Sequence, residues 1–167
     1  MTKQKLRQFP AGLGDGSLHR TVDVSEVREL TTTLLGAMQY RGFVNAEFKK
    51  DSRDGQLRLI EINPRTSMAN QIGAAAGIDF PWLGYRYLTS GARHNEHGAE
   101  FKRDVQYVDE ILDLRAFLAL RHEGRPTTAA RLCSHARTRA FAVWSTRDPL
   151  PFAAQAWGLI NRRTTRP

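Results

Sequence analysis

Two alternating stretches separated by a short turn place the strongest constraint on how this chain folds. Residues 43–50 and 56–63 each alternate between apolar and polar side chains, which is the pattern of a β-strand with one buried face. The segment between them, Ser52 to Gly55, is rich in residues that favour turns. The sequence therefore predicts a β-hairpin between residues 43 and 63.

The turn also predicts the register of this hairpin. A three-residue loop over Arg53, Asp54 and Gly55 would place Gly55 in the left-handed conformation that such loops require. Counting outward gives three opposed pairs: Lys49 with Leu59, Glu47 with Glu61, and Asn45 with Asn63. The other face is apolar and is expected to pack on helices; it comprises Val44, Ala46, Phe48, Ile60 and Ile62.

The polar face of the predicted hairpin carries an unusual pair of like charges. Two glutamates directly opposed on a sheet have Cβ atoms about 4.5 to 5.5 Å apart, and such a pair is destabilising on its own. A proton, a basic side chain such as Arg65, or a divalent cation would relieve the repulsion. Magnesium prefers a few oxygen ligands, so Glu47, Glu61 and Asn63 are the predicted metal-binding set, with a plain solvated face as the alternative.

The segments before the hairpin predict a strand and a helix. Residues 5–9 suit a short strand, which Pro10 and the following glycines end in a surface loop. Apolar residues at helical spacing then predict a helix over residues 24–40, capped by Asp23 and closed by Gly42, with its apolar stripe in the core.

The segments after the hairpin predict a further set of helices. Thr66 or Ser67 is expected to cap a short helix that runs to Ala76 and stops at Gly77. A second helix follows from Pro81 to Gly91, and residues 92–100 are expected to form a loop. Residues 102–108 suit a strand and 110–122 a helix or mixed segment, and the pattern weakens beyond them.

Composition excludes several classes of protein. No run approaches the roughly 18 apolar residues of a membrane-spanning helix, and no apolar stretch typical of a signal peptide follows Met1, so we expect a cytoplasmic protein. The single Cys133 cannot form an internal disulfide. The net charge of +8 would attract phosphate, but the arginines after Leu114 are spread singly, which leaves nucleic-acid binding as a lesser alternative.

The hairpin sequence resembles the terminal metal-binding motif of the ATP-grasp superfamily. The likeness is carried by residues 45–51 (Asn-Ala-Glu-Phe-Lys-Lys-Asp), by Asp54 and Gly55, and by residues 59–65 (Leu-Ile-Glu-Ile-Asn-Pro-Arg). Residues 5–10 and 77–81 are similar to the flanks of that motif. Within the superfamily the chain looks most like the carboxylate–amine ligases of the carbamoyl-phosphate-synthase-like and D-aspartate-ligase-like kinds.

The resemblance implies a role for each site residue. Glu47 and Glu61 would ligate magnesium, with Glu61 bridging two ions and Asn63 completing the set. Arg65 would stabilise the transferred phosphoryl group or the acyl-phosphate, and Leu59, two positions before the cofactor-binding Glu61, would line the adenine pocket. The implied cofactors are ATP and Mg²⁺ or Mn²⁺. The implied reaction joins a small carboxylate to an amine through an acyl-phosphate, giving an amide-type bond.

The resemblance covers residues of the C-terminal half of an ATP-grasp enzyme. In that family the ATP site lies between two subdomains, and we expect this chain to carry the metal-binding wall and to lack the lysine-bearing nucleotide-binding half. We therefore expect an α+β C-terminal ATP-grasp subdomain over residues 1–91, an antiparallel sheet with helices on one face, and a basic extension over 92–167 that packs on it. Ligase activity would need a separate N-terminal half or a second copy. The alternative is an inactive ATP-grasp remnant that serves as an interaction module.

Overall fold

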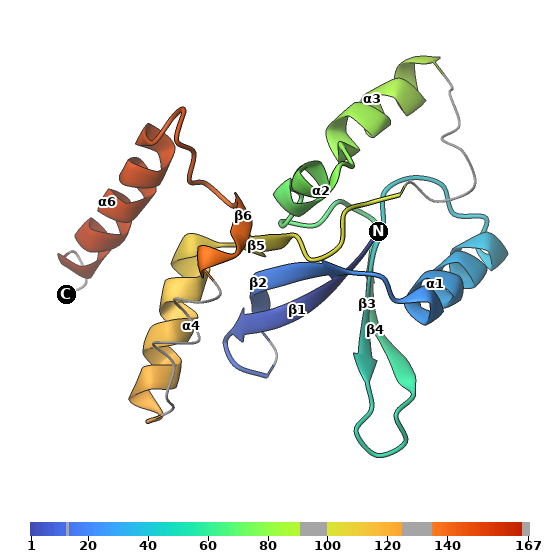
Figure 1. Cartoon of the computed structure of the whole chain (residues 1–167), viewed down its shortest axis with the longest axis horizontal. Helices are drawn as coiled ribbons and strands as arrows, with labels where there is room; N and C mark the ends of the chain where they lie inside the picture. Colours follow the sequence, from blue (N-terminus) through green and yellow to red (C-terminus); the bar gives the residue numbers. More distant parts are fainter. Residues whose placement is uncertain (13, 91–99, 125–134, 165–167) are drawn as a thin grey trace. The chain divides into compact units, whose positions relative to one another are not determined.

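The chain combines helices with two separate sheets, as the expected α+β class requires (Figure 1). The structure is a computed structural model that describes residues 1–12, 14–90, 100–124 and 135–164. The expected loop over 92–100 lies outside these residues except for its last residue, as does Cys133. The described elements are, in chain order, β1 (Thr2–Phe9), β2 (Asp15–Val22), α1 (Ser25–Ala37), β3 (Asn45–Lys50), β4 (Leu57–Asn63), α2 (Gln71–Ala76), α3 (Phe80–Ser90), β5 (Gln106–Val108), α4 (Glu110–His122), β6 (Thr138–Phe141) and α6 (Leu150–Thr164).

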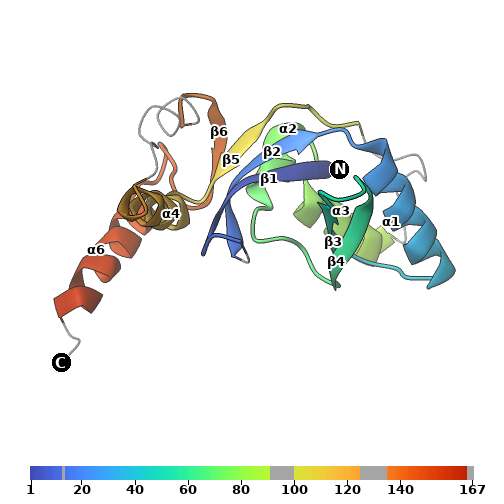
Figure 2. The same cartoon turned by 90° about the horizontal axis from the view of Figure 1, so that it is seen from below.

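The larger sheet is mixed, and the expectation of one antiparallel sheet was wrong. Its four strands follow the order β1-β2-β5-β6, and Figures 1 and 2 show β1, β2 and β5 side by side. Strand β2 pairs with β5 in antiparallel register, with Leu18 opposite Val108, whereas β5 and β6 are parallel. The hairpin β3–β4 forms a sheet of its own.

Strand β2 was missed by the sequence analysis because its buried side chains do not alternate in polarity. Ser17, Leu18 and His19 are all buried, and so is Thr21, so both faces of this strand are covered. A strand covered on both faces loses the simple alternation that marks a half-exposed strand. Here the buried positions are also largely polar, and the glycines just before them favoured a loop.

The described chain divides into two compact units. The first unit comprises Met1–Lys3 and Thr21–Asp104, and the second comprises Gln4–Arg20 and Val105–Pro167. Each unit has its own small set of buried apolar side chains. In the first unit these are Ala69, Ile72, Ala76 and Ile78, and in the second they are Leu18, Val105, Tyr107, Val108, Ala116 and Ala140.

Helix α1 differs from its prediction in its cap and in its burial. Its N-cap is Val24, whose apolar side chain makes no capping bond, and the carboxylate of the predicted cap Asp23 pairs with Arg28 at 3.0 Å and Arg103 at 2.6 Å. None of its side chains is fully buried, and Leu30 is exposed. The expectation that its apolar stripe lies in the core was therefore wrong.

Helix α2 ends at Ala76 as the sequence predicted, whereas the predicted end of the second helix at Gly91 lies outside the described residues. Gly77 adopts a left-handed conformation (φ 97°) after α2, and the Asp79 carboxylate accepts the backbone N–H of Trp82 at 2.9 Å in the first turn of α3. The start of α2 was predicted too early. Its N-cap is Asn70, and the Ser67 hydroxyl accepts the N–H of Ala69 in the preceding turn at 3.2 Å.

Gly73 in α2 lies where there is no space for a side chain. A Cβ on this residue would lie 2.4 Å from the Phe80 ring and 3.0 Å from the Ile78 carbonyl oxygen. We expect Gly73→Ala to lower the free energy of unfolding by about 1 to 3 kcal/mol, the usual cost of overpacking. Urea unfolding measures this.

Gly36 in α1 is the matched control, because a Cβ there would meet nothing within 4 Å. Gly36→Ala should raise the free energy of unfolding by up to about 1 kcal/mol through helix propensity. A similar gain in Gly73→Ala would contradict the packing described for α2.

The second unit contains the elements that the sequence defined least well. Strand β5 is shorter than the stretch 102–108 predicted for it, whereas α4 matches the predicted range 110–122. Asp109 caps α4, since its carboxylate accepts the N–H of Leu112 at 2.9 Å. Within the part of the chain that the structure describes, no helix is long and apolar enough to cross a membrane.

Candidate functional site

The β3–β4 hairpin forms with the central register that the sequence predicted. Glu47 lies directly opposite Glu61, and Asn45 lies opposite Asn63. Because side chains alternate along a strand, these four residues share one face of the hairpin. The two carboxylates that define the candidate site are therefore brought together by the backbone pairing itself.

The turn of the hairpin is one residue longer than predicted. The N–H of Asp51 donates to the Gln56 carbonyl, and the N–H of Gly55 donates to the Asp51 carbonyl, both at 2.8 Å. These bonds close a four-residue loop, in which Gly55 has the expected positive φ of 72°. Next to this loop, Lys49 faces Arg58, so its predicted pairing with Leu59 was wrong.

A β-bulge restores the register between the turn and the glutamates. The pairing shifts between Glu47 and Phe48, so that Phe48 faces Leu59 and Ile60 is the extra residue. Ile60 is 61% exposed, and its prediction as part of the packed apolar face was wrong. The added loop residue and the bulge residue offset each other, which is why Glu47 still faces Glu61.

The polar face is organised by amide-to-carboxylate hydrogen bonds within each strand. The Asn45 amide nitrogen donates to Oε1 of Glu47 at 3.5 Å, and the Asn63 amide nitrogen donates to Oε1 of Glu61. Glu61 is exposed, and the other three side chains are half-buried. The face is thus reachable from solvent, and it presents oxygen atoms from both strands.

Arg65 and Leu59 lie on either side of the second glutamate in the sequence. The Arg65 guanidinium is exposed and donates to the Thr66 carbonyl at 3.2 Å. It forms no ion pair with any carboxylate in the described ranges, so Arg65 is not the basic side chain that separates the two glutamates. Leu59 is 43% exposed, which leaves its side chain free to contact a ligand.

The donor set of this face suits a hard divalent cation. Two carboxylates and two amide side chains supply only oxygen ligands, once an amide turns its oxygen toward the metal, and oxygen is the ligand that Mg²⁺ and Mn²⁺ prefer. Among the residues that the structure describes, no group of three or more His, Cys, Asp or Glu side chains could hold a metal ion. The hairpin face, with its two carboxylates, is the candidate that the geometry favours.

A second polar cluster lies in the other unit and was not predicted. Asp113 is fully buried, and Nη1 of Arg7 donates to both of its carboxylate oxygens, at 2.6 and 2.7 Å. The Ser17 hydroxyl donates to Oδ1 at 3.1 Å, and Nε2 of His135 lies 3.0 Å from Oδ2. The Arg7 guanidinium is therefore bound to the carboxylate of Asp113.

Comparison with known proteins gives one family match. Residues 8–111 match the model of a family described as ATP-grasp in the biosynthetic pathway with Ter operon. The match spans the whole hairpin, including both opposed glutamates, Asn63 and Arg65. No curated protein and no solved structure matches the chain.

Proposed function

Because the chain belongs to the family of ATP-grasp proteins in the biosynthetic pathway with Ter operon, we propose that it is part of an ATP-dependent ligase whose metal site is the hairpin face. The direct opposition of Glu47 and Glu61 carries the proposal. Two carboxylates opposed in this way repel each other on their own, and a bound cation turns the repulsion into attraction. Membership of an ATP-grasp family supports ATP as the nucleotide that such a cation would accompany.

Each residue of the face has a proposed task. Glu47, Glu61 and Asn63 hold the divalent cation, and the exposed Arg65 guanidinium contacts the phosphoryl group. Leu59 contributes an apolar surface against the adenine ring. Bound Mg²⁺ would supply neutralisation of the charge on the phosphate oxygens, which is most of what phosphoryl transfer asks of a protein.

The proposed reaction is carboxylate–amine ligation. A carboxylate oxygen of the substrate attacks the γ-phosphorus of ATP, and ADP leaves. The amine nitrogen of the second substrate then attacks the carbonyl carbon of the acyl-phosphate, and phosphate leaves as the amide-type bond forms. The protein contributes positioning and charge, since neither step requires a covalent bond to the chain.

The proposal includes a second polypeptide, either a nucleotide-binding subdomain or another copy of this chain. It is supported by large apolar side chains that are exposed on the first unit. Those on the hairpin and on α3 are Leu59, Ile60, Trp82, Tyr85, Tyr87 and Leu88. Surface of this kind is typical of protein contacts when it is contiguous and rimmed by polar residues.

Calorimetric titration of Mg²⁺ together with ATP into the purified chain tests the metal site. We expect binding heat in the wild type and a loss of affinity of at least about tenfold in Glu61→Ala, the loss common for residues that hold or support a metal. Glu29→Ala is the matched control, because Glu29 is an exposed glutamate on α1, away from the hairpin.

The two variants separate the possible outcomes. Heat that is lost in Glu61→Ala and kept in Glu29→Ala supports a metal–nucleotide face on the hairpin. Equal heat in wild type and Glu61→Ala would move the site elsewhere in the chain. No heat in the wild type would refute binding by this chain alone and favour an inactive remnant of the family.

A further inference from the structure

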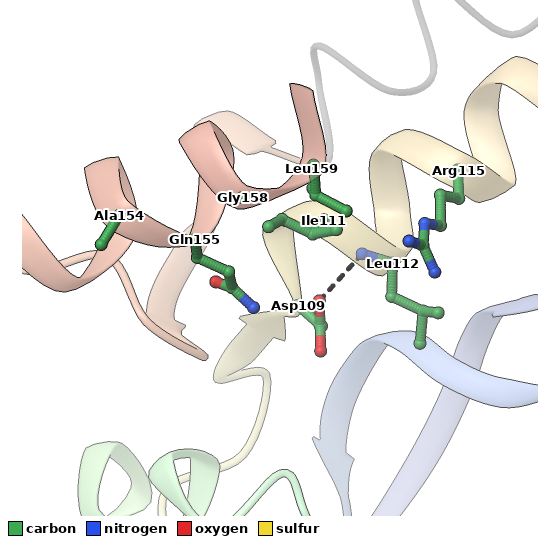
Figure 3. Close-up of a pocket in the computed structure, with 8 residues that line it drawn as sticks. All are labelled: Asp109, Ile111, Leu112, Arg115, Ala154, Gln155, Gly158 and Leu159. Carbon is green, nitrogen blue, oxygen red and sulfur yellow. Dashed lines mark hydrogen bonds between the residues drawn. The ribbon is translucent and has the colours of Figure 1, made fainter. Parts of the chain in front are cut away.

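A cavity lies between helices α4 and α6 of the second unit, and no part of the proposed reaction uses it (Figure 3). Its volume is about 490 Å³, within the range of about 300 to 1,000 Å³ that is usual for small-molecule sites. All of its lining residues belong to the same unit. The cavity is therefore independent of the hairpin.

Contacts through residues 143–144 link the start of α4 to the start of α6. The Glu110 carboxylate in the first turn of α4 accepts the backbone N–H groups of Val143 and Trp144, at 3.3 and 2.6 Å. The Trp144 ring packs edge-to-face on Phe152 of α6. Gly158 contributes no side chain, and a Cβ there would meet nothing within 4 Å, so the space between the helices stays open.

One part of the cavity is apolar. Ile111 and Leu112 of α4 and Leu159 of α6 line it, and all three side chains are half-buried. In Figure 3 the Leu159 side chain points toward Ile111 across the gap between the helices. A hydrocarbon group placed against these side chains would leave water, which favours an aliphatic ligand.

Two opposite charges complete the lining. The Asp109 carboxylate uses Oδ1 to accept the Leu112 N–H, which leaves Oδ2 for a further donor. The Arg115 guanidinium forms no hydrogen bond or ion pair with any residue in the described part of the chain. In Figure 3 the Gln155 amide points toward Asp109 and adds a neutral polar group.

The two charges line the same cavity, so a single short ligand can reach both. Asp109 and Arg115 are six positions apart, which is about 9 Å along a helix axis at about 1.5 Å per residue and about a third of a turn around it. Helical side chains lean toward the N-terminus, so the long Arg115 side chain shortens this gap. An amine near Asp109 and a carboxylate near Arg115 would then be separated by the length of one or two amino-acid residues.

We propose that this cavity binds an aliphatic amino acid or dipeptide. Its ammonium group contacts Asp109, its carboxylate contacts Arg115, and its hydrocarbon side chain packs on the apolar wall. The lining offers two opposite charges and an apolar wall to a single ligand. A fatty carboxylate or a simple amine satisfies only one of the two charged residues.

Calorimetric titration with four probes tests this pairing of charges on the full chain. L-leucine and L-leucyl-L-leucine carry both charges, N-acetyl-L-leucine lacks the ammonium group, and L-leucinamide lacks the carboxylate. We expect at least one of the two zwitterions to bind, and each singly charged analogue to bind at least tenfold more weakly. No binding of either zwitterion, or equal binding of all four probes, would overturn the proposal.

Conservative substitutions assign each charge to its residue. Arg115→Gln should weaken L-leucine binding at least tenfold and leave L-leucinamide binding unchanged. Asp109→Asn should weaken L-leucine binding similarly and leave N-acetyl-L-leucine unchanged, and Asn keeps the helix cap because it caps as well as Asp. Unchanged L-leucine affinity in both variants would overturn the assignment.

A side chain that fills the cavity should block L-leucine binding. Gly158→Leu places a side chain in open space on α6, so it should abolish L-leucine binding while the melting temperature is kept. Gly36→Leu is the matched control on α1, where the space is also open, and should bind as the wild type does. Glu61→Ala should retain L-leucine binding, which separates failure of this proposal from failure of the metal site.

Discussion

Replacing Arg7 by Met is expected to lower the free energy of unfolding by about 3 kcal/mol, the low end of the cost of breaking a buried ion pair. Arg7 donates to both oxygens of the Asp113 carboxylate, which is fully buried, and its own side chain is only 17% exposed. The substitution leaves the carboxylate without its guanidinium. Ser17 and His135 still contact it, which places the expected loss at the low end.

Arg58→Met is the matched control for this prediction. Arg58 pairs with Asp54 at 2.6 Å, but the two side chains are 54% and 39% exposed. Exposed pairs contribute between about 0 and 1 kcal/mol, so this variant should unfold almost as the wild type does in urea. An equal loss of unfolding free energy in both variants would mean that the burial of Asp113 does not determine how much its ion pair contributes to stability.

A double variant separates the charge from its packing. Arg7→Met with Asp113→Leu removes both partners and leaves apolar groups, so it should recover much of the stability lost in Arg7→Met alone. Recovery would show that the lost stability came from the isolated carboxylate. A double variant less stable than Arg7→Met would show that Asp113 also stabilises its other partners.

The hairpin was predictable because its information is local. Alternation and a Gly-containing turn are read within about twenty residues, and family resemblance lies in the same segment. The loop length and the bulge were not predictable from this pattern, since a four-residue loop with one bulge and a three-residue loop without one put Glu47 opposite Glu61 alike. The opposition of Glu47 and Glu61 was therefore predicted from a register that was only partly correct.

Much of the second unit could not be predicted from the sequence, because its contacts join residues that are far apart in the chain. Arg7 and Asp113 are 106 residues apart, and neither residue alone predicts a buried ion pair. Strand β2 contacts β5 across a similar separation, through buried polar residues such as Ser17 that give no apolar signal. Helix α1 shows the opposite failure, because its amphipathic pattern predicted burial that the described chain does not provide.

The effect of Glu61→Gln on stability should change sign with the metal. In metal-free buffer the substitution removes a directly opposed like charge, so it should raise the free energy of unfolding by about 0.2 to 1 kcal/mol, the usual size of a cross-strand pair effect. The substituted amide side chain keeps an oxygen that accepts from the Asn63 amide, so the hydrogen bond of the strand is preserved.

At saturating concentrations of Mg²⁺ and ATP, the wild type should become more stable than Glu61→Gln. A ligand at about 100 times its Kd stabilises the native state by about 2.7 kcal/mol, so the wild type gains this and Glu61→Gln does not. Urea unfolding with the metal and nucleotide, and again after chelation by EDTA, measures both signs. Glu29→Gln should respond to metal as the wild type does. A Glu61→Gln variant that is less stable in both buffers would mean that the carboxylate supports the hairpin itself, because only a metal ligand gives opposite signs.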